Sequence, residues 1–561
     1  MTTTRESDQM AAPLDLLLTS GAIGPWRRLA PSSSWWELAK GVVRHPGPSA
    51  RRLGSLGSEL AAIAGGVSTR APANRDKRFA DPAWTGNPLL RRLLQAYLAS
   101  ADTARGLVHD ADLGRRDRER MIFVVDNLIE ALSPSNSPLL SPETWKAAID
   151  SGGGNLVRGA RALAADLAQA PRIPSMVDPD AFTVGEDLAC TEGAVVFRSE
   201  VLELIQYRPR TEQVRDVPLL VVPPVINKYY VTDLAPGRSL VEHLVDHGQQ
   251  VFMISWRNPD TRHRAWGADT YCQAILDAMD AVERITGTER AHVLGTCSGG
   301  MLASMTAAHL ADTGRLHRLA GLSLAVTVLD NSDAGLVSAM VSERTAATAI
   351  ARSGEKGYLD GRALAEVFAW LRPGDLIWSY WVNNYLLGRT PPPFDVLSWN
   401  ADTTRMAAAM HRDFLNLAMS NALTTPGGAS VLGSPIDLAK VDLPSYVVAG
   451  IADHICPWQA CYQSTQLLGG ESRFVLSTSG HIASIVNPPG NPKATFQVND
   501  DHGADPEAWL RGADTRQGSW WPDLIAWLAE RSGELVEAPA ELGGAGLRPM
   551  EPAPGTYVFD A

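Results

Sequence analysis

The sequence predicts an α/β fold with a mostly parallel sheet, preceded by a mostly helical domain. From about residue 185 onward, short apolar runs of strand length alternate with helical stretches. This alternation is typical of parallel strands joined by helices that cover both faces of the sheet. Before residue 180, apolar residues instead recur at three- and four-residue spacing between breaks rich in Pro, Gly and Ser.

Residues 1–180 are expected to form the helical domain. The apolar spacing predicts helices over Pro88–Ala99, Arg118–Leu132 and Leu156–Ala168. This part of the sequence carries no catalytic signature. We therefore expect its helices to serve packing, dimerisation or attachment to an apolar surface.

Residues 181–561 are expected to form the α/β domain. It opens with a β-hairpin, Ala194–Phe197 and Val201–Tyr207. The strands expected after the hairpin are Leu219–Val222, Val251–Ser255, Ala291–Leu294, Leu322–Val326, Tyr446–Ala449 and Phe474–Leu476. The interval 330–437 interrupts the alternation with helical or irregular, aromatic-rich sequence, which predicts an insertion that forms a helical cap.

Composition limits the classes of function. Lys and Arg number 50 against 62 Asp and Glu, a formal charge of −12, which argues against nucleic acid as a general partner. The five cysteines form no CxxC pair and no cluster with zinc-ligand spacing, so we expect a reduced, cytosolic setting and no metal. No signal peptide and no apolar run of about 18 residues is visible, so no membrane span is expected.

Cys297 is the predicted nucleophile. It stands in the segment GTCSGG at 295–300, between an apolar strand-like run and a helical stretch. Strand, sharp turn and helix form the nucleophile elbow of the α/β-hydrolase fold, in which glycines permit close backbone approach. The start of the following helix favours a thiolate. The alternative is a small buried cysteine in a tight turn. The other four cysteines lack this context and are expected to be structural.

Asp453 and His481 are the predicted partners of the thiol, because this fold places nucleophile, acid and histidine in that order along the chain. Asp453 follows the strand Tyr446–Ala449, and His481 follows the next strand. Both would lie at the carboxyl edge of the sheet, where catalytic groups gather. His454 is a rival histidine, ranked second as a pocket-lining group, since adjacent side chains usually point apart.

The oxyanion hole is expected to use the backbone N–H of Ser298 and one N–H from the loop after Leu219–Val222. Val225 and Ile226 are the candidates for that second donor, and the sequence does not choose between them.

The chain resembles the polyhydroxyalkanoate synthases over nearly its full length. Several specific segments carry the resemblance besides the GTCSGG box. They are DKRFADPAW at 76–84, PPVINKYY at 223–230, SWRNP at 255–259, LRPGDLIW at 371–378, FDVLSWN at 394–400, ADH at 452–454 and GHIASIVNPP at 480–489. Length and the single-polypeptide pattern resemble the homomeric class I and class II enzymes, and several stretches are nearer to class II.

The resemblance implies an activity and partners. Members join (R)-3-hydroxyacyl groups from CoA thioesters into a polyester and release CoA, with the thioester as substrate and no cofactor. Cys297, Asp453 and His481 fall on the family's triad positions. Arg372 becomes a candidate contact for CoA phosphates, with a structural arginine as the alternative, and Trp399 a candidate anchor of a dimer. The family further implies a homodimer in the cytoplasm at the surface of polyester granules.

Two rival functions remain. A thioesterase or depolymerase would use the same triad to transfer the acyl group to water. A non-catalytic granule-coating or scaffold protein would not need Cys297 at all.

Overall fold

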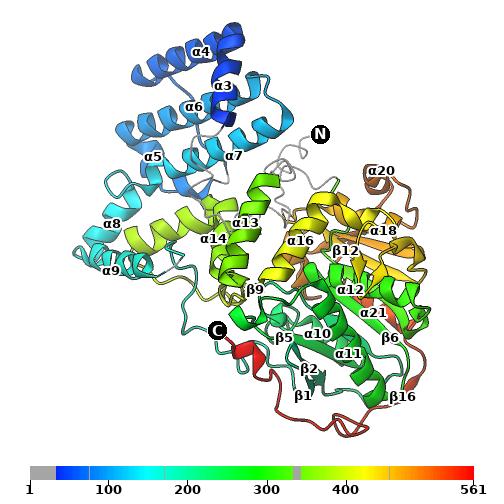
Figure 1. Cartoon of the computed structure of the whole chain (residues 1–561). Helices are drawn as coiled ribbons and strands as arrows, with labels where there is room; N and C mark the ends of the chain where they lie inside the picture. The colour runs from blue at the N-terminus through cyan, green and yellow to red at the C-terminus, as the bar shows by residue number, and fades with distance from the viewer. Residues whose placement is uncertain (1–32, 75, 170, 333–342, 454) are drawn as a thin grey trace. The chain divides into compact units, whose positions relative to one another are not determined.

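The computed structural model describes residues 33–74, 76–169, 171–332, 343–453 and 455–561 (Figure 1). These residues divide into two compact units. One unit combines the N-terminal helices up to Asp178 with residues 365–392, and the other comprises Pro179–Leu364 and Pro393–Ala561.

The second unit is built on a ten-stranded sheet with the order β1-β2-β5-β4-β6-β7-β12-β13-β14-β15. Its strands are β1 (Gly193–Arg198), β2 (Leu202–Tyr207), β4 (Leu219–Val222), β5 (Val251–Trp256), β6 (Ala291–Thr296), β7 (Leu319–Ala325), β12 (Ser445–Gly450), β13 (Ser472–Ser477), β14 (Thr495–Val498) and β15 (Asp514–Gln517). Strands β5, β4, β6, β7, β12 and β13 are parallel, while β1 and β2 extend one side and β14 and β15 the other in antiparallel fashion.

The predicted hairpin and the six predicted parallel strands are confirmed, with ends shifted by up to three residues. Strands β14 and β15 were not predicted. Every residue of β15 is exposed, so its sequence, Asp-Thr-Arg-Gln, has no apolar alternation to mark it as a strand.

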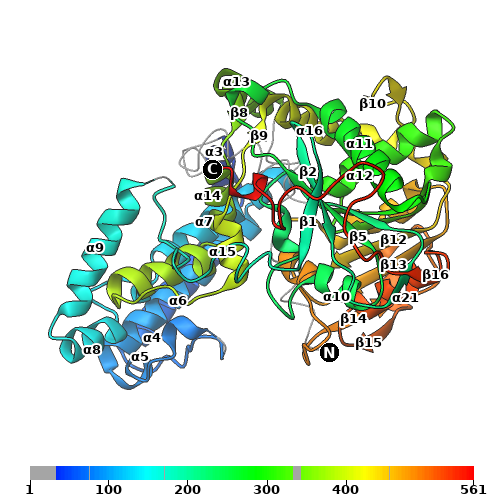
Figure 2. The ribbon, with the colours of Figure 1, turned by 90° about the horizontal axis from the view of Figure 1, so that it is seen from below.

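Helices cover both faces of the sheet, as expected for buried parallel strands. Figure 2 shows α11 (Ala268–Thr286) and α12 (Ser298–Asp312) on one face, and α10 (Leu240–Asp246) and α21 (Trp521–Ala529) on the other. Helix α12 is buried along nearly its whole length. It therefore fixes the residues at its N-terminus firmly against the sheet.

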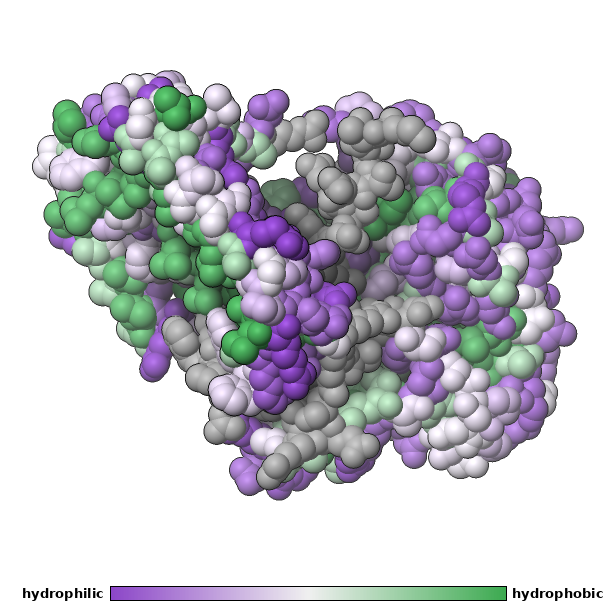
Figure 3. Space-filling model, turned by 90° about the horizontal axis from the view of Figure 1, so that it is seen from above, coloured by the Kyte–Doolittle hydropathy of each residue, from purple (hydrophilic) through white to green (hydrophobic). Residues whose placement is uncertain are grey.

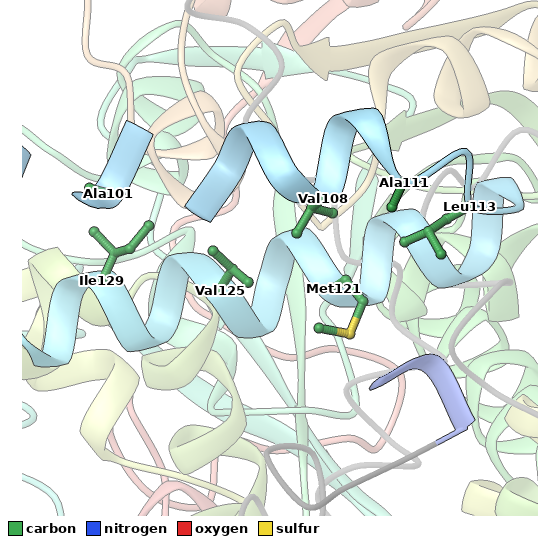
Figure 4. Packing of buried hydrophobic residues seen from close by; sticks show 7 residues of the cluster. All are labelled: Ala101, Val108, Ala111, Leu113, Met121, Val125 and Ile129. Carbon is green, nitrogen blue, oxygen red and sulfur yellow. The ribbon is translucent and has the colours of Figure 1, made fainter. Parts of the chain in front are cut away.

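The first unit is helical, as predicted. Its main helices are α3 (Ser33–Arg44), α4 (Pro46–Ala64), α6 (Pro88–Asp110), α7 (Arg115–Ala131), α8 (Pro142–Asp150) and α9 (Gly154–Ala168). Figure 4 shows side chains of α6 and α7 interlocking in a buried cluster. The cluster comprises Ala101, Val108, Ala111, Leu113, Met121, Val125 and Ile129.

Residues 365–392 pack against these N-terminal helices, whereas the sequence predicts them as part of the cap insertion 330–437. The Asn155 side chain donates a hydrogen bond to the Leu386 carbonyl (2.8 Å), and the Trp381 indole donates one to the Asn136 carbonyl (3.1 Å). A Cβ at Gly159 would lie 1.9 Å from the Tyr385 carbonyl oxygen, so this contact requires glycine. Among the described helices, none has both the length and the apolar character needed to cross a bilayer.

Candidate active site

Three loops meet at the carboxyl edge of the parallel sheet and bring the predicted catalytic side chains together. Cys297 directly follows β6, Asp453 follows β12, and His481 follows β13. Strands β12 and β13 are hydrogen-bonded neighbours, and only β7 separates β12 from β6. A Cβ at Gly450 would lie 2.5 Å from the Ser479 carbonyl oxygen, so this glycine lets the Asp453 and His481 loops touch.

Cys297 occupies a sharp turn between strand and helix. Its φ of 50° and ψ of −120° are strained for a non-glycine residue, as expected at a nucleophile elbow. The flanking glycines allow the turn. A Cβ on Gly295 would lie 2.4 Å from the Gly300 Cα, and one on Gly299 would lie 2.3 Å from the Val222 carbonyl oxygen. The Cys297 side chain is partly exposed.

Asp453 and His481 form a buried hydrogen-bonded pair. The Asp453 Oδ2 lies 2.7 Å from the His481 Nδ1, and the other carboxylate oxygen accepts the backbone N–H groups of Ile455 and Cys456, both at 2.8 Å. The pair leaves the His481 Nε2 free, and a ring nitrogen of His481 lies within 4.8 Å of the Cys297 sulfur. Sulfur, imidazole and carboxylate thus stand in the order that nucleophile, base and orienting acid require.

Cys456 is a fourth member of the site, although its sequence context predicts a structural role. Its sulfur, the Cys297 sulfur and a His481 ring nitrogen all lie within 4.8 Å of one another. The Cys456 side chain is buried beside the Cys297 sulfur. Its place three residues after Asp453, on a loop already assigned to the site, is the signal that could have revealed it.

The electrostatics favour a charged nucleophile. The hydrogen bond from Cys456 lowers the pKa of Cys297, and the His481 imidazolium adds to this effect against the opposing effect of burial. Burial disfavours charge on His481, but the Asp453 carboxylate and the Cys297 thiolate outweigh it and raise the pKa of His481. The hydrogen bond with Cys297, together with burial, raises the pKa of Cys456. These shifts favour an ion pair of Cys297 thiolate and His481 imidazolium, with Cys456 as the neutral thiol beside it.

The loop after β4 contacts the start of α12, and its backbone amides differ in what they bind. The Val225 N–H donates to the Ser298 hydroxyl (3.1 Å), so it is already engaged. Among the described residues, the Ile226 N–H makes no hydrogen bond. The loop is held in place by the Trp256 indole, which donates to the Pro223 carbonyl (3.0 Å). The Ser298 N–H, at the first residue of α12, contributes to lowering the pKa of Cys297.

The contacts of the site described above include neither Arg372 nor Trp399. Arg372 belongs to the helical unit, is about half exposed, and pairs with Asp375 at 2.6 Å. Trp399 is buried in its own chain, with its indole donating to the Lys228 carbonyl (2.8 Å), so it is no exposed anchor. His454 lies outside the described residues.

The remaining cysteines contribute no sulfur to this cluster. The Cys272 thiol is buried and donates to the Leu302 carbonyl, and the Cys461 thiol is buried and donates to the Cys456 carbonyl. Cys190 is partly exposed.

The sheet order, the elbow and the ordered cysteine, histidine and aspartate define an α/β-hydrolase-fold protein with a thiol in the nucleophile position. The family model of the alpha/beta hydrolase fold matches residues 230–488, which confirms the predicted fold. Residues 75–244 match the model of the poly-beta-hydroxybutyrate polymerase (PhaC) N-terminus.

Curated relatives extend this likeness over nearly the whole chain. Poly(3-hydroxyalkanoate) polymerase 2 of Ectopseudomonas oleovorans is 48% identical over 93% of both chains, and polymerase 1 of that organism is 47% identical over 94% of both. The poly(3-hydroxyalkanoate) polymerase subunit PhaC of Cupriavidus necator is 41% identical over 89% of this chain and 85% of its own. The chain belongs to the poly(3-hydroxyalkanoate) polymerase family, as its sequence motifs predicted.

Proposed function

We propose that this protein polymerises (R)-3-hydroxyacyl groups, taking them from CoA thioesters and joining them to a growing polyester with release of CoA. Full-length similarity to proteins named poly(3-hydroxyalkanoate) polymerases supports the reaction. The single structural observation that carries the proposal is the line of Cys297, His481 and Asp453 at one edge of the sheet.

Loading of the acyl group uses the thiolate. The Cys297 sulfur attacks the thioester carbonyl carbon, and the bond from that carbon to the CoA sulfur breaks. The proton on the His481 Nε2 passes to the departing CoA thiolate. Because one thioester replaces another, the acyl group remains activated for the next step.

Transfer of the acyl group uses the neutral imidazole that loading leaves behind. His481 takes the proton of a 3-hydroxyl group, whose oxygen attacks the acyl carbon held on Cys297. The carbon–sulfur bond breaks, and Cys297 leaves as a thiolate beside the regenerated imidazolium. Asp453 holds the imidazole in the tautomer that both proton transfers need.

The oxyanion formed in each step requires preorganised donors. We assign this role to the backbone N–H groups of Ser298 and Ile226. The Ser298 amide opens α12, where the helix dipole also favours negative charge. Val225 is set aside because its N–H is engaged by the Ser298 hydroxyl.

The helical unit is proposed to attach the enzyme to the polyester. Most of the exposed large apolar side chains among the described residues belong to this unit, including Val43, Val67, Leu89, Leu132, Leu139 and Ile149. Figure 3 shows hydrophobic residues gathered on the lobe formed by these helices. Exposed apolar patches of this kind mark interaction surfaces, and a polyester granule in the cytoplasm presents a matching apolar one. Homodimerisation is the second use proposed for this unit.

Product analysis tests the proposed reaction. The purified protein is supplied with 3-hydroxyacyl-CoA substrates from four to ten acyl carbons, and CoA release, polymer and free hydroxy acid are measured. We expect polymer, with medium chain lengths preferred. Free hydroxy acid without polymer would identify a hydrolase instead. The Cys297→Ala variant should release no CoA, whereas Cys190→Ser, a matched change at a partly exposed cysteine, should behave as the wild type.

Partition onto washed polyester particles tests the attachment. Replacing the exposed Leu139 and Ile149 together by serine should lower binding several-fold, while the matched change Met550→Ser in the other unit should not. Equal binding by all three proteins would contradict this role. Analytical ultracentrifugation of the same proteins reports on the dimer.

A further inference from the structure

The side-chain cluster around the nucleophile has the composition of a metal site. Two cysteine sulfurs and one histidine nitrogen lie within 4.8 Å of one another, although they come from positions 297, 456 and 481 and show no ligand spacing in the sequence. The three loops of the sheet edge bring them together. We propose that Cys297, Cys456 and His481 bind one thiophilic divalent cation, Zn²⁺ or Cd²⁺, which blocks the nucleophile reversibly.

The distances suit such a cation after a small adjustment. Tetrahedral zinc holds cysteine sulfur at about 2.3 Å and histidine nitrogen at about 2.0–2.1 Å, so its ligand atoms lie about 3.5–3.8 Å apart. The three atoms here are separated by at most 4.8 Å. Side-chain rotations that move each atom by about 1 Å would bring them to the spacing of a zinc site. Cys461 does not join them, because its thiol is directed at a backbone carbonyl.

His481 is already oriented as a ligand. Its Nδ1 is engaged by the Asp453 carboxylate at 2.7 Å, which leaves the Nε2 to bind the cation. Histidines that bind zinc usually carry a carboxylate on their other nitrogen, which fixes the ring and strengthens its donor atom. The arrangement that prepares His481 for proton transfer therefore also prepares it for coordination.

Charge and access are consistent with occupation. Two thiolates balance a divalent cation, and binding releases the proton of the Cys456 thiol and the proton on the His481 Nε2 to solvent. The Asp453 carboxylate accepts a hydrogen bond from the backbone N–H of Cys456. This bond fixes the loop that carries the second sulfur. Cys297 is partly exposed, which gives an ion a route to the site and leaves its fourth position open to water. Thiolate ligands favour zinc and cadmium over magnesium or calcium.

The test measures binding directly and does not depend on polymerase activity. Metal-free wild-type protein is titrated with Cd²⁺, and the ultraviolet thiolate-to-cadmium absorption is recorded, while calorimetry with Zn²⁺ gives the affinity and stoichiometry. We expect one ion per chain. The matched variant is Cys456→Ser, which keeps the size of the side chain but replaces the sulfur. It should lose about half of the absorption and bind Zn²⁺ at least about tenfold more weakly.

Further variants separate this site from other thiols. Cys297→Ala should also lose about half of the absorption, and Cys190→Ser should retain all of it. A wild type without the thiolate-to-cadmium band, or a Cys456→Ser variant with unchanged band and affinity, would overturn the proposal. If the protein proves to be a polymerase, Zn²⁺ should slow CoA release in the wild type at lower concentration than in Cys456→Ser, and a chelator should restore it.

Discussion

The backbone N–H of Val225 donates a hydrogen bond to the hydroxyl of Ser298, 73 residues further along the chain, at 3.1 Å. The bond joins the loop after β4 to the first turn of α12, directly beside Cys297. Ser298 thus has two separate parts in the site. Its side chain holds the loop, and its backbone N–H faces the reacting atoms.

The first prediction concerns this bond. Ser298→Ala leaves the buried Val225 N–H without a partner, which costs about 1–2 kcal/mol and allows the loop to shift. Because the loop carries a proposed oxyanion donor, we expect the same free energy to be lost in the transition state, so kcat falls about 5- to 30-fold. Steady-state CoA release measures it. The control is Ser304→Ala on the same helix. The Ser304 hydroxyl donates to the Gly300 carbonyl, and its loss should leave kcat unchanged.

The second prediction concerns the acid. Asp453→Asn keeps an oxygen for the backbone N–H groups of the loop but turns an amide N–H toward the His481 Nδ1. The imidazole must then carry its proton on Nε2, where it can no longer accept one. We expect kcat to fall about 10³- to 10⁴-fold with the fold intact. A variant with more than a tenth of the wild-type rate would remove Asp453 from the mechanism.

The third prediction concerns the thiolate. Because the pKa of Cys297 is lowered, alkylation by iodoacetamide should remain fast well below the ordinary cysteine pKa of about 8.5. Cys456→Val removes the thiol that contributes most to lowering the pKa of Cys297. The pKa of Cys297 should therefore rise by about one unit. The midpoint of the alkylation rate against pH then moves upward, so reactivity falls in the acidic range around the midpoint and changes little at neutral pH. Mass spectrometry identifies the alkylated residue, and an unmoved midpoint would contradict the hydrogen bond.

The sequence was sufficient to predict the central sheet and the three residues at its edge. Buried parallel strands produce continuous apolar runs, and the chain order of nucleophile, acid and histidine follows from the order of those strands. Cys297 directly follows β6, and Asp453 and His481 lie in the short loops after β12 and β13, so their meeting required only that the strands pair as expected.

The features that the sequence did not predict depend on contacts between distant segments. Cys456 joins the site because the Asp453 carboxylate accepts its N–H and so fixes the loop, which no local pattern encodes. Val225 and Ile226 are both apolar and adjacent, and only the position of the Ser298 hydroxyl distinguishes their amides. The placement of residues 365–392 with the N-terminal helices follows from packing at Gly159, more than 200 residues earlier.

The fourth prediction concerns the turn itself. Gly299→Ala would place a Cβ 2.3 Å from the Val222 carbonyl and 2.4 Å from that of Pro223, and neither backbone atom can move freely. We expect a loss of stability of about 3 kcal/mol or more and no activity. The control is Gly354→Ala in α13 (Glu343–Lys356), where a Cβ meets nothing within 4 Å. It should be neutral or stabilising by up to about 1 kcal/mol.

The fifth prediction concerns the C-terminal segment, which covers the exposed edge of β1. Backbone hydrogen bonds run from Met550 to the Val195 carbonyl and from Val195 to the Glu551 carbonyl, both at 2.9 Å. Glu203 on β2 binds the segment through hydrogen bonds to its backbone. Its fully buried carboxylate accepts the backbone N–H groups of Thr556 and Tyr557, both at 2.9 Å. Covering an edge strand in this way prevents its pairing with another chain.

Glu203→Gln should therefore release this segment. The substituted amide lacks the charge that pairs with Arg198, and its N–H groups face the backbone N–H groups of Thr556 and Tyr557. We expect the free energy of unfolding to fall by about 3 kcal/mol. Limited proteolysis should then cleave within residues 549–561, and the variant should aggregate as the β1 edge becomes exposed. The matched change Glu192→Gln breaks a solvent-exposed pair with Arg208 and should cost less than about 1 kcal/mol. If both variants resist the protease equally, Glu203 does not hold the segment in place.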